Sequence, residues 1–464
     1  MSAASAETAP PTRAALAPLV VSATRSAPAV EQLPITVERI GSERFRSSPA
    51  LTLDATLRES AAFSLFRRSS GLTANPTAQG VSLRGLGPSG ASRSLVMVDG
   101  VPLNDPFGGW VTWYKVPRLS LAGAEIARGG GSGAWGNAAL GGTLSLFSED
   151  FNQPGGLGVV TSGEFGTWLG EAAITQRITS RSALRLDGAA FRTEGFYTVM
   201  PSQRGPIDRP LDSEYHRLQL SWEQRLTKNT TAVITGRTFS EERGNGTPLQ
   251  QNGTRENFLS TTFSGSTELL PAWSWVSYVQ RQHFNSFFSA VDATRTTETP
   301  ANDQYDVPSS AAGTAFTAQW LHANRATTTA GADARWVRGE TREAFSYLNG
   351  RFTRQRRAGG EQSFAGLFAT HDRPLFNQWF SSLALRLDHW ENAGGHRREV
   401  DLNTSSVARD ERYARDQGVE LSPRLGFTGP LGLAGLRGRA AVYLFFSIPT
   451  LNEYYPPFRL GNVN

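Results

Sequence analysis

The residue types that most often carry out chemistry are sparse in this sequence. The chain has no cysteine, which excludes disulfide scaffolds, cysteine-based metal sites and cysteine nucleophiles together. Its six histidines are scattered without metal-ligand spacing, and no G-x-S-x-G nucleophile motif occurs. Four loop aspartates offer oxygen ligands for calcium, although oxygen-rich loops are common: Asp99, Asp105, Asp208 and Asp212. We therefore predict no enzyme, no cofactor and no metal site.

One glycine-rich segment matches the dinucleotide-binding pattern. Gly131–Gly136 reads G-x-G-x-x-G and follows a predicted short strand. A nucleotide site requires a helix next and an acidic residue about 20 positions later. Here Asn137–Gly142 leads instead into another predicted strand. We interpret the glycines as permitting tight turns and close packing against a wall, and a soluble nucleotide-dependent enzyme is the weaker alternative.

Length and composition point to a chain of several domains with a mixed surface. A chain of 464 residues exceeds one ordinary domain, and only 39% of its residues are hydrophobic. The 46 basic and 41 acidic residues give a net charge of +5 without a basic run that suggests nucleic acid. This balance is typical of a solvated surface, or of a mouth that attracts anionic ligands. No apolar stretch reaches the roughly 18 residues that a transmembrane helix needs. This criterion does not apply to strands of a membrane barrel, because only every second residue of such a strand faces lipid.

Composition and residue patterning divide the chain into three parts. Residues 1–30 are rich in Ala, Pro, Ser and Thr, which predicts disorder, and they lack the apolar core of a signal peptide; we expect the start to be incomplete or misassigned rather than cytoplasmic. Residues 31–150 predict a compact mixed domain. We expect a helix at Ala50–Ser60, capped by Thr52. Three short strands are expected at Ser94–Val98, Ala124–Arg128 and Thr143–Phe147, with a turn at Asp99-Gly100.

From residue 151 onwards, apolar and polar residues alternate. In Arg217–Leu226, Leu218, Leu220 and Trp222 alternate with polar residues. Leu383–Asp388 and Val419–Phe427 repeat the pattern. A two-residue period predicts strands with one apolar and one charged face. We predict roughly thirteen such strands by this pattern.

Periodicity alone also fits a soluble sandwich, but three features favour a membrane barrel. Asn229–Glu241, Ser274–Val291 and Thr327–Phe345 are longer than ordinary strands, as tilted membrane strands of about 9–11 residues must be. Aromatic residues gather near strand ends, as in an interfacial girdle. No amphipathic helix is available to cover the apolar face. The predicted fold is therefore mainly β, with an α/β domain followed by an antiparallel transmembrane β-barrel, incomplete in this chain.

Two long motifs resemble the plug domain of TonB-dependent receptors. VSLRGLGPSGASRSLVMVDGVPLND, at Val81–Asp105, is similar to the family's arginine-glycine strand and its DGVP turn. AGAEIARGGGSGAWGNAALGGTLSLFSED, at Ala122–Asp150, is similar to the plug's closing motif. Upstream, Pro18–Arg25 resembles a TonB box. Gly163–Trp168 resembles the first barrel hairpin, and Ile448–Asn464 resembles a later barrel stretch ending in Gly-Asn-x-x-Leu.

The resemblance implies a receptor in the outer membrane of a Gram-negative bacterium that takes up a scarce ligand, most often a ferric siderophore and next cobalamin. Its partners would be outer-membrane lipid, the ligand, and TonB with its inner-membrane energising complex. The family has a signal peptide and 22 barrel strands, so we expect this chain to be a fragment or a truncated frame. Strand addition to TonB would use main-chain hydrogen bonds of the patch Leu19, Val20, Val21, Ser22, Ala23 and Thr24.

Six further residues receive expected roles from the resemblance. Arg84 and Arg128, each followed by Gly, look like the plug arginines that pair with barrel carboxylates; solvated surface arginines are the alternative. Aromatic residues after the DGVP turn could face a ligand or pack against loops: Phe107, Trp110, Trp113 and Tyr114. The rival function is a secreted or surface all-β adhesin, which would be soluble without detergent and would lack a TonB box.

Overall fold

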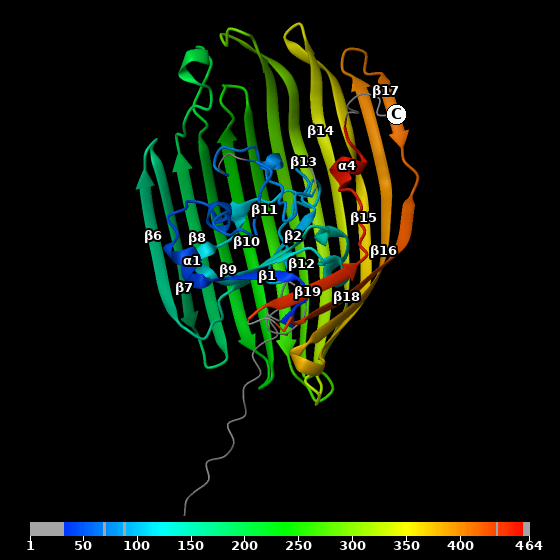
Figure 1. Cartoon of the computed structure of the whole chain (residues 1–464). Helices are drawn as coiled ribbons and strands as arrows, with labels where there is room; N and C mark the ends of the chain where they lie inside the picture. Colours follow the sequence, from blue (N-terminus) through cyan, green and yellow to red (C-terminus); the bar gives the residue numbers. More distant parts are fainter. Residues whose placement is uncertain (1–31, 68–70, 87–89, 433–434, 458–464) are drawn as a thin grey trace, which may run out of the picture.

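The computed structural model describes residues 32–67, 71–86, 90–432 and 435–457, which form two β-sheets (Figure 1). A five-stranded sheet belongs to the N-terminal domain, which we call the plug, and a 14-stranded sheet forms the wall around it. The helices of the described residues are short, with four to six residues each. Among the described residues, no helix is long and apolar enough to cross a membrane.

The plug is built on a mixed sheet in the order β1-β4-β5-β2-β3. Its strands are β1 Thr36–Gly41, β2 Ser94–Val98, β3 Val101–Pro102, β4 Leu121–Arg128 and β5 Gly142–Ser148. Asp99 and Gly100 both have positive φ, 50° and 81°, as the two central residues of a type I′ hairpin require. This turn joins β2 to β3, so the expected turn and the strand Ser94–Val98 are confirmed.

Short helices and apolar side chains complete the plug. The helices are α1 Ser42–Ser47, α2 Leu53–Leu57 and α3 Ser132–Trp135, with 3-10 turns η2 Pro76–Ala78, η3 Trp113–Lys115, η4 Arg118–Ser120 and η5 Gly136–Ala139. The predicted helix Ala50–Ser60 is shorter than expected, and the side chain of Thr52 makes no capping hydrogen bond. Val96, Ile126 and Leu144 are fully buried in the plug core.

The wall is an antiparallel sheet that runs from β6 to β19 in chain order. Its strands are β6 Gly155–Gly163, β7 Thr167–Arg177, β8 Ser182–Thr193, β9 Ser213–Arg225, β10 Thr230–Gly244, β11 Gln251–Gly265, β12 Ala272–Val291, β13 Glu298–Leu321, β14 Thr327–Leu348, β15 Arg351–Pro374, β16 Phe380–Asp401, β17 Val407–Arg412, β18 Asp416–Pro430 and β19 Arg437–Tyr443. β17 and β18 both pair with β16. In the described residues the sheet is open, with β6 and β19 at its edges.

The alternating pattern places apolar side chains outside the wall and polar ones inside. On β9, Leu218 and Leu220 are 52% and 50% exposed, whereas Gln219 between them is 6% exposed. On β18, Leu421 is 56% exposed and Ser422 is 1% exposed. Exposed apolar patches of this size mark surfaces that contact a membrane or another protein. The structure therefore confirms that the apolar set points outward and the polar set inward.

The outer apolar band lies near one end of the long strands. β13 and β15 have 24 residues each, far more than the roughly 9–11 that cross a bilayer. On β16 the exposed leucines Leu383, Leu385 and Leu387 follow closely on the strand's start at Phe380. The strands therefore project beyond the membrane at the other end, shown at the top of Figure 1, where the long 194–212 loop also lies. Barrels place their long loops outside the cell, so this end is extracellular.

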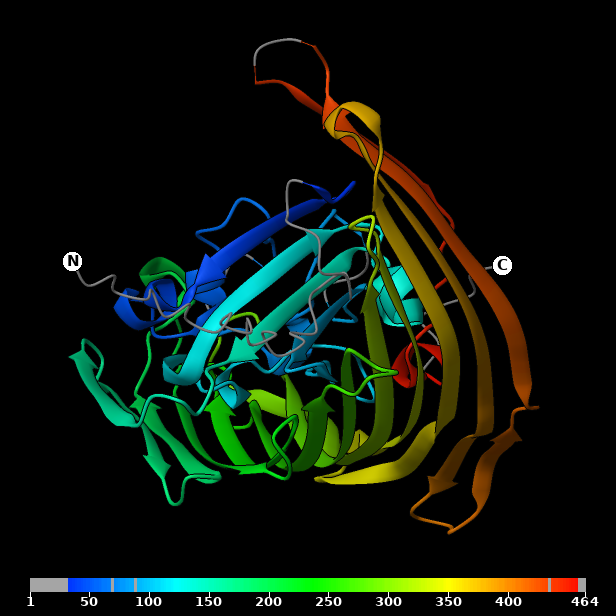
Figure 2. The ribbon, with the colours of Figure 1, turned by 90° about the horizontal axis from the view of Figure 1, so that it is seen from below.

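The plug lies on the concave side of the curved wall (Figure 2). After β19 the chain returns to the interior and forms the short helix α4 Leu451–Tyr454. Leu451 and Tyr455 are 0% and 1% exposed, among plug and wall side chains. A backbone amide of this segment, Asn452 N, donates to the carbonyl of Phe107 in the plug. The interior is therefore filled by the plug and by this returning segment together.

Candidate plug–wall interface and extracellular vestibule

A buried lysine ties the plug to the wall. Lys115 Nζ lies 2.6 Å from Glu256 Oε2 on β11, and both side chains are only 2% exposed. Glu256 also accepts from Arg237 on β10 at 2.9 Å, and Gln282 on β12 accepts from Lys115. A buried charge is tolerated only when it is paired and hydrogen-bonded. The carboxylate of Glu256 thus neutralises one cation from the plug and one from the wall.

The same network reaches a plug carboxyl group. Asp105 accepts from the amides of Phe107 and Gly108, at 2.9 and 2.7 Å, and from the side chain of Gln282. Burial raises the pKa of Asp105, although the amide of Gly108 and the charge of Lys115 act in the opposite direction. Raised pKa values of this kind are typical of carboxyl groups withdrawn from water. The plug loop at Asp105 is therefore fixed to the wall by polar contacts.

Arginine side chains of the plug and of the wall hold the plug segment Trp113–Ser120, which contains η3 and η4. Arg118 Nε lies 2.5 Å from Glu171 Oε2 on β7, with both side chains buried. From the wall, Arg217 Nη1 donates to the carbonyls of Tyr114 and Val116 at 3.0 and 2.7 Å. These hydrogen bonds satisfy backbone groups that the irregular segment would otherwise leave buried and unpaired.

Lys115 and Arg118 were not singled out from the sequence, although a signal for them exists. They are the two basic residues in the otherwise largely apolar segment Trp110–Leu121. Basic side chains amid residues that must be buried need anionic partners on another element. The sequence does not show which element that is, because both partners are on distant strands, β7 and β11.

Arg84 and Arg128 do not form the expected ion pairs. Arg84 is exposed and its Nη1 donates to the hydroxyl of Tyr443 on β19 at 2.6 Å. Arg128 is exposed at the end of β4. Within the described ranges, neither has a carboxylate within ion-pair distance. The pairing itself exists, but Lys115 and Arg118 make it because they lie on the segment that faces the wall.

The four aromatic residues after the DGVP turn are packing residues and not an open ligand surface. Trp113 is 1% exposed and meets Phe63 edge-on in the plug core, with ring centroids 5.6 Å apart. Trp110 and Phe107 are 4% and 2% exposed in a cluster shared with the wall. Tyr114 is 4% exposed and lies 4.8 Å from the ring of Tyr215 on β9. The packing alternative is therefore the one that the structure shows.

The glycine-rich segment makes a close contact with the wall. It forms the single helical turn α3 and then η5. Gly136 has φ +68°, and a Cβ atom there would lie 2.8 Å from Arg386 Nε on β16. Arg386 pairs with Asp333 at 2.7 Å and with Asp388 at 2.6 Å. Glycine is required both by the backbone conformation and by this approach, as the structural interpretation of the motif predicted.

The returning segment adds a second set of plug contacts. Arg93 of the plug donates to both carboxylate oxygens of Glu453, at 3.0 and 2.6 Å. Thr450 and Glu453 form a capping box at the start of α4. Bidentate arginine–carboxylate pairs are among the strongest charge-assisted hydrogen bonds. The charge of Arg93 and the amide of Thr450 hold the pKa of Glu453 below its usual range.

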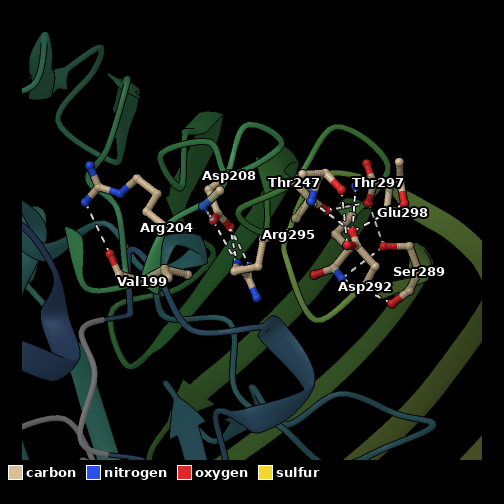
Figure 3. A network of polar contacts seen from close by, with 12 residues as sticks. Val199, Arg204, Asp208, Thr247, Ser289, Asp292, Arg295, Thr297 and Glu298 are labelled. Atoms are coloured by element: carbon tan, nitrogen blue, oxygen red, sulfur yellow. Dashed lines mark hydrogen bonds and ion pairs between the residues drawn. The ribbon is translucent and has the colours of Figure 1, made fainter. Parts of the chain in front are cut away.

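Polar contacts also join the extracellular loops (Figure 3). Arg295, between β12 and β13, pairs with Asp208 of the 194–212 loop at 2.5 Å. Glu298 accepts from Ser289, from Thr247 and from the amide of Leu249, at 2.6–2.8 Å. Hydrogen bonding to Arg295 lowers the pKa of Asp208. Three successive loops are thus connected above the wall.

The inner wall above the plug carries arginine and aromatic side chains. On β14 the odd-numbered residues face inward, because a Cβ at Gly339 would lie 2.4 Å from Phe107 of the plug. Phe345 shares this face, and Arg356 on β15 lies over its ring at 4.2 Å. Arg397 on β16 is 7% exposed and interacts electrostatically with Arg356, Arg409 and Glu411. No ion pair is recorded for Arg397 in the part of the chain that the structure describes.

The four loop aspartates do not converge. Asp99 accepts from Ser148, Asp105 belongs to the Lys115 network and Asp208 pairs with Arg295. Asp212 lies beside Gly244 at the end of β10. Among the described residues, no group of three or more His, Cys, Asp or Glu side chains is arranged to hold a metal ion. The predicted TonB-binding patch, Leu19–Thr24, lies outside the described residues.

Comparison with known proteins identifies the plug. Residues 29–143 match the family model of the TonB-dependent receptor plug domain. No curated protein sequence matches the chain.

Solved structures share the fold of most of the chain. The ferric citrate transporter FecA in its unliganded form has a TM-score of 0.64 and 13% identity, covering 87% of this chain and 62% of FecA. The ferric-catecholate import receptor Fiu from E. coli K12 has a TM-score of 0.67 and 13% identity, covering 89% and 67%. The copper transporter OprC has a TM-score of 0.66 and 14% identity, covering 90% and 64%.

The chain spans about two thirds or less of the length of these structures. The matches nevertheless cover both sheets, and the plug match coincides with the smaller one. The proteins matched are named as transporters and as an import receptor. Residues 29–143 are therefore a plug domain of the TonB-dependent receptor family, and the strands that follow share the fold of the solved transporters and receptors.

Proposed function

We propose that the protein takes up a scarce anionic metal chelate through the outer membrane, and that TonB supplies the mechanical work. The supporting observation is the plug, which fills the interior of the wall and is held there by discrete buried ion pairs at Lys115 and Arg118. Such contacts hold the plug at rest, yet a directed pull breaks them one at a time. The outer membrane has no energy source of its own, so the pull must come from the periplasm.

We propose that Leu19–Thr24 is the segment that TonB pulls. The sequence Leu-Val-Val-Ser-Ala-Thr suits an added strand, because its main-chain groups can pair whatever the side chains are. It precedes β1, the first plug strand, by about a dozen residues. A force applied at Leu19–Thr24 therefore acts directly on the edge of the plug sheet, since β1 is an outer strand of that sheet.

Val20→Pro should weaken binding to the periplasmic domain of TonB by about tenfold or more. Proline removes one main-chain donor and fixes φ near −65°, which disfavours a central position in a paired strand. Calorimetry with a peptide of residues 10–30 measures the affinity. Ala15→Pro, outside the patch, is the matched control and should bind like the parent peptide. Equal affinity for all three peptides would remove Leu19–Thr24 from this role.

The cargo we propose is an anionic ferric chelate. Structural neighbours carry names of such ligands: ferric citrate for FecA, and ferric catecholate for Fiu. In this chain, Arg397 on the inner wall forms no ion pair among the described residues, although Glu411 on β17 faces it across the strands. The ring of Phe345 lies beside its arginine neighbour Arg356. Arginine and aromatic groups suit negatively charged, aryl-bearing ligands.

Arg397→Gln should lower the affinity for ferric catecholates or ferric citrate about tenfold, because one charge-assisted contact is lost. Quenching of tryptophan fluorescence in detergent follows the titration. Arg398→Gln is the matched control, because Arg398 follows Arg397 directly and its side chain points to the opposite face of β16. If neither chelate binds, or if both variants bind like the parent, the proposed cargo is wrong. The proposed role of Leu19–Thr24 in TonB binding would not be affected, because the peptide experiment tests it separately.

A further inference from the structure

A glutamate and a histidine meet on the outer face of the wall although a strand separates them. Glu340 on β14 and His396 on β16 are both direct cross-strand partners of Gly359 on β15. His396 Nε2 lies 2.7 Å from Glu340 Oε2, and the two side chains are 34% and 20% exposed. A Cβ atom at Gly359 would lie 3.0 Å from Glu340 Cβ, so glycine leaves the space above β15 free for this contact. We call Glu340 and His396 the clasp.

Both ring nitrogens of His396 face oxygen atoms that accept hydrogen bonds. Nδ1 lies 3.0 Å from the carbonyl oxygen of Gly394, and Nε2 faces the carboxylate of Glu340. A neutral imidazole carries one N–H, whereas the imidazolium carries two. Only the protonated ring can donate both hydrogen bonds, so deprotonation must release either Gly394 or Glu340. His283 differs, because its hydrogen bond to Asp306 uses one ring nitrogen, for which a neutral ring suffices.

The clasp lies at an irregularity of the wall to which the returning segment is packed. The pairing of β15 with β16 shifts register here, and Gly394 has φ +63°. Such bulges interrupt the hydrogen-bond ladder and bend the strand. On the inner face, a Cβ atom at Gly360 would lie 2.5 Å from the ring of Tyr455, and one at Gly395 would lie closer still. The shape of the bulge therefore decides how closely Tyr455, directly after α4, can pack against the wall.

We propose that the clasp is a pH-sensitive switch, which fixes the bulge and the packing of Tyr455 when His396 is protonated and loosens both when His396 is neutral. Histidine is the side chain whose charge ordinarily changes between about pH 5 and 8. His396 lies about 30 Å along β16 from Leu387, the last exposed leucine of that strand. It is therefore outside the bilayer and follows the pH of the extracellular solution. The proposal requires neither the proposed cargo nor TonB.

The charges around the clasp decide the direction of the pH effect. The hydrogen bond to Glu340 raises the pKa of His396, against the effects of burial and of the charge of Arg338. Although burial acts to raise it, hydrogen bonds from His396 and Arg342 lower the pKa of Glu340 to about 2, so this carboxylate stays ionised. The stabilisation is therefore complete below the ordinary histidine pKa of about 6.5 and is lost as the pH rises through the raised value. Further charged side chains occupy neighbouring outward positions: Arg357 and Glu361 on β15, Arg398 on β16, and Asp410 and Arg412 on β17.

Hydrogen exchange of the detergent-solubilised chain tests the switch at about pH 5.5 and about pH 8.5, on either side of the ordinary histidine range. Rates are corrected for the intrinsic effect of pH on exchange. The amides of Gly394–Arg398 should exchange about tenfold faster at the higher pH, because one charge-assisted hydrogen bond is lost, and the amides of α4 should also exchange faster. His396→Gln should exchange at the faster rate at both pH values, since glutamine stays neutral.

The matched control is His283→Gln, which removes a histidine paired with a carboxylate on the same outer face. This variant should keep the pH dependence of the parent chain. Equal corrected rates in the parent at both pH values would overturn the proposal without any variant. A pH dependence that persists in His396→Gln would also overturn it, because another group would then be titrating. Faster exchange at Gly394–Arg398 without a change in α4 would contradict the link to Tyr455.

Discussion

Glu256→Leu should detach the plug segment Trp113–Ser120 from the wall and lower the free energy of unfolding by about 3–5 kcal/mol. The reason is that one carboxylate serves two buried cations, Lys115 and Arg237, at 2.6 and 2.9 Å. Removing it leaves both without a charge partner at that site. Hydrogen exchange of the segment's amides should accelerate by about two to three orders of magnitude, at about 1.4 kcal/mol per factor of ten.

Lys115→Met should cost less than Glu256→Leu, although both break the same pair. After Lys115→Met, Glu256 keeps Arg237 as its partner, and the methionine fills part of the lysine's volume. The external control is Glu242→Gln, because Glu242 pairs with Arg255 at 3.3 Å where both side chains are about 75% exposed. Exposed pairs contribute about 0–1 kcal/mol. Equal effects of Glu256→Leu and Glu242→Gln would show that burial of the pair does not matter.

The strands of the wall were predictable because each carries its own periodic signal. Outward residues meet lipid and inward residues meet the plug, so each strand alternates without help from distant sequence. The predicted strand Thr327–Phe345 differs from β14, Thr327–Leu348, only at its end. In Ser274–Val291 the sequence alone does not separate an apolar from a polar face, because aromatic residues occur at both odd and even positions. The structure places Tyr278 inside, 8% exposed, and Trp275 outside, 49% exposed.

The plug–wall contacts were less predictable because they join residues far apart in the sequence. The resemblance to the plug family drew attention to Arg84 and Arg128, whose Arg-Gly pattern is local. The buried cations Lys115 and Arg118 have no such pattern, and their partners are 141 and 53 residues away. The same holds for the aromatic residues from Phe107 to Tyr114, whose burial depends on the wall. Local sequence shows that a group is polar or aromatic, whereas its burial depends on the tertiary structure.

Leu421→Arg should impair folding into a bilayer far more than Glu420→Arg, although the two positions are adjacent on β18. Leu421 pairs with Leu387 on the outer face, whereas Glu420 pairs with Asp388 on the inner face. An arginine near the bilayer midplane costs about 2–4 kcal/mol on the lipid face, while the interior tolerates one. At Glu420 an arginine would also lie opposite the carboxylate of Asp388. The free energy of unfolding from lipid vesicles measures the difference.

Mutation alone does not separate a membrane barrel from a soluble β-sandwich, since burying arginine in either would be costly. Spin labels distinguish them, because oxygen concentrates in hydrocarbon and polar relaxation agents do not. A label at Leu421→Cys should show the high oxygen accessibility of lipid. A label at Leu220→Cys should show the same, because the side chain of Leu220 is 50% exposed on the same face. A label at Glu420→Cys should not. Water-like accessibility at Leu220 and Leu421, or protection from both agents, would contradict a lipid-facing surface, because a side chain that is half exposed on this wall must meet either lipid or water.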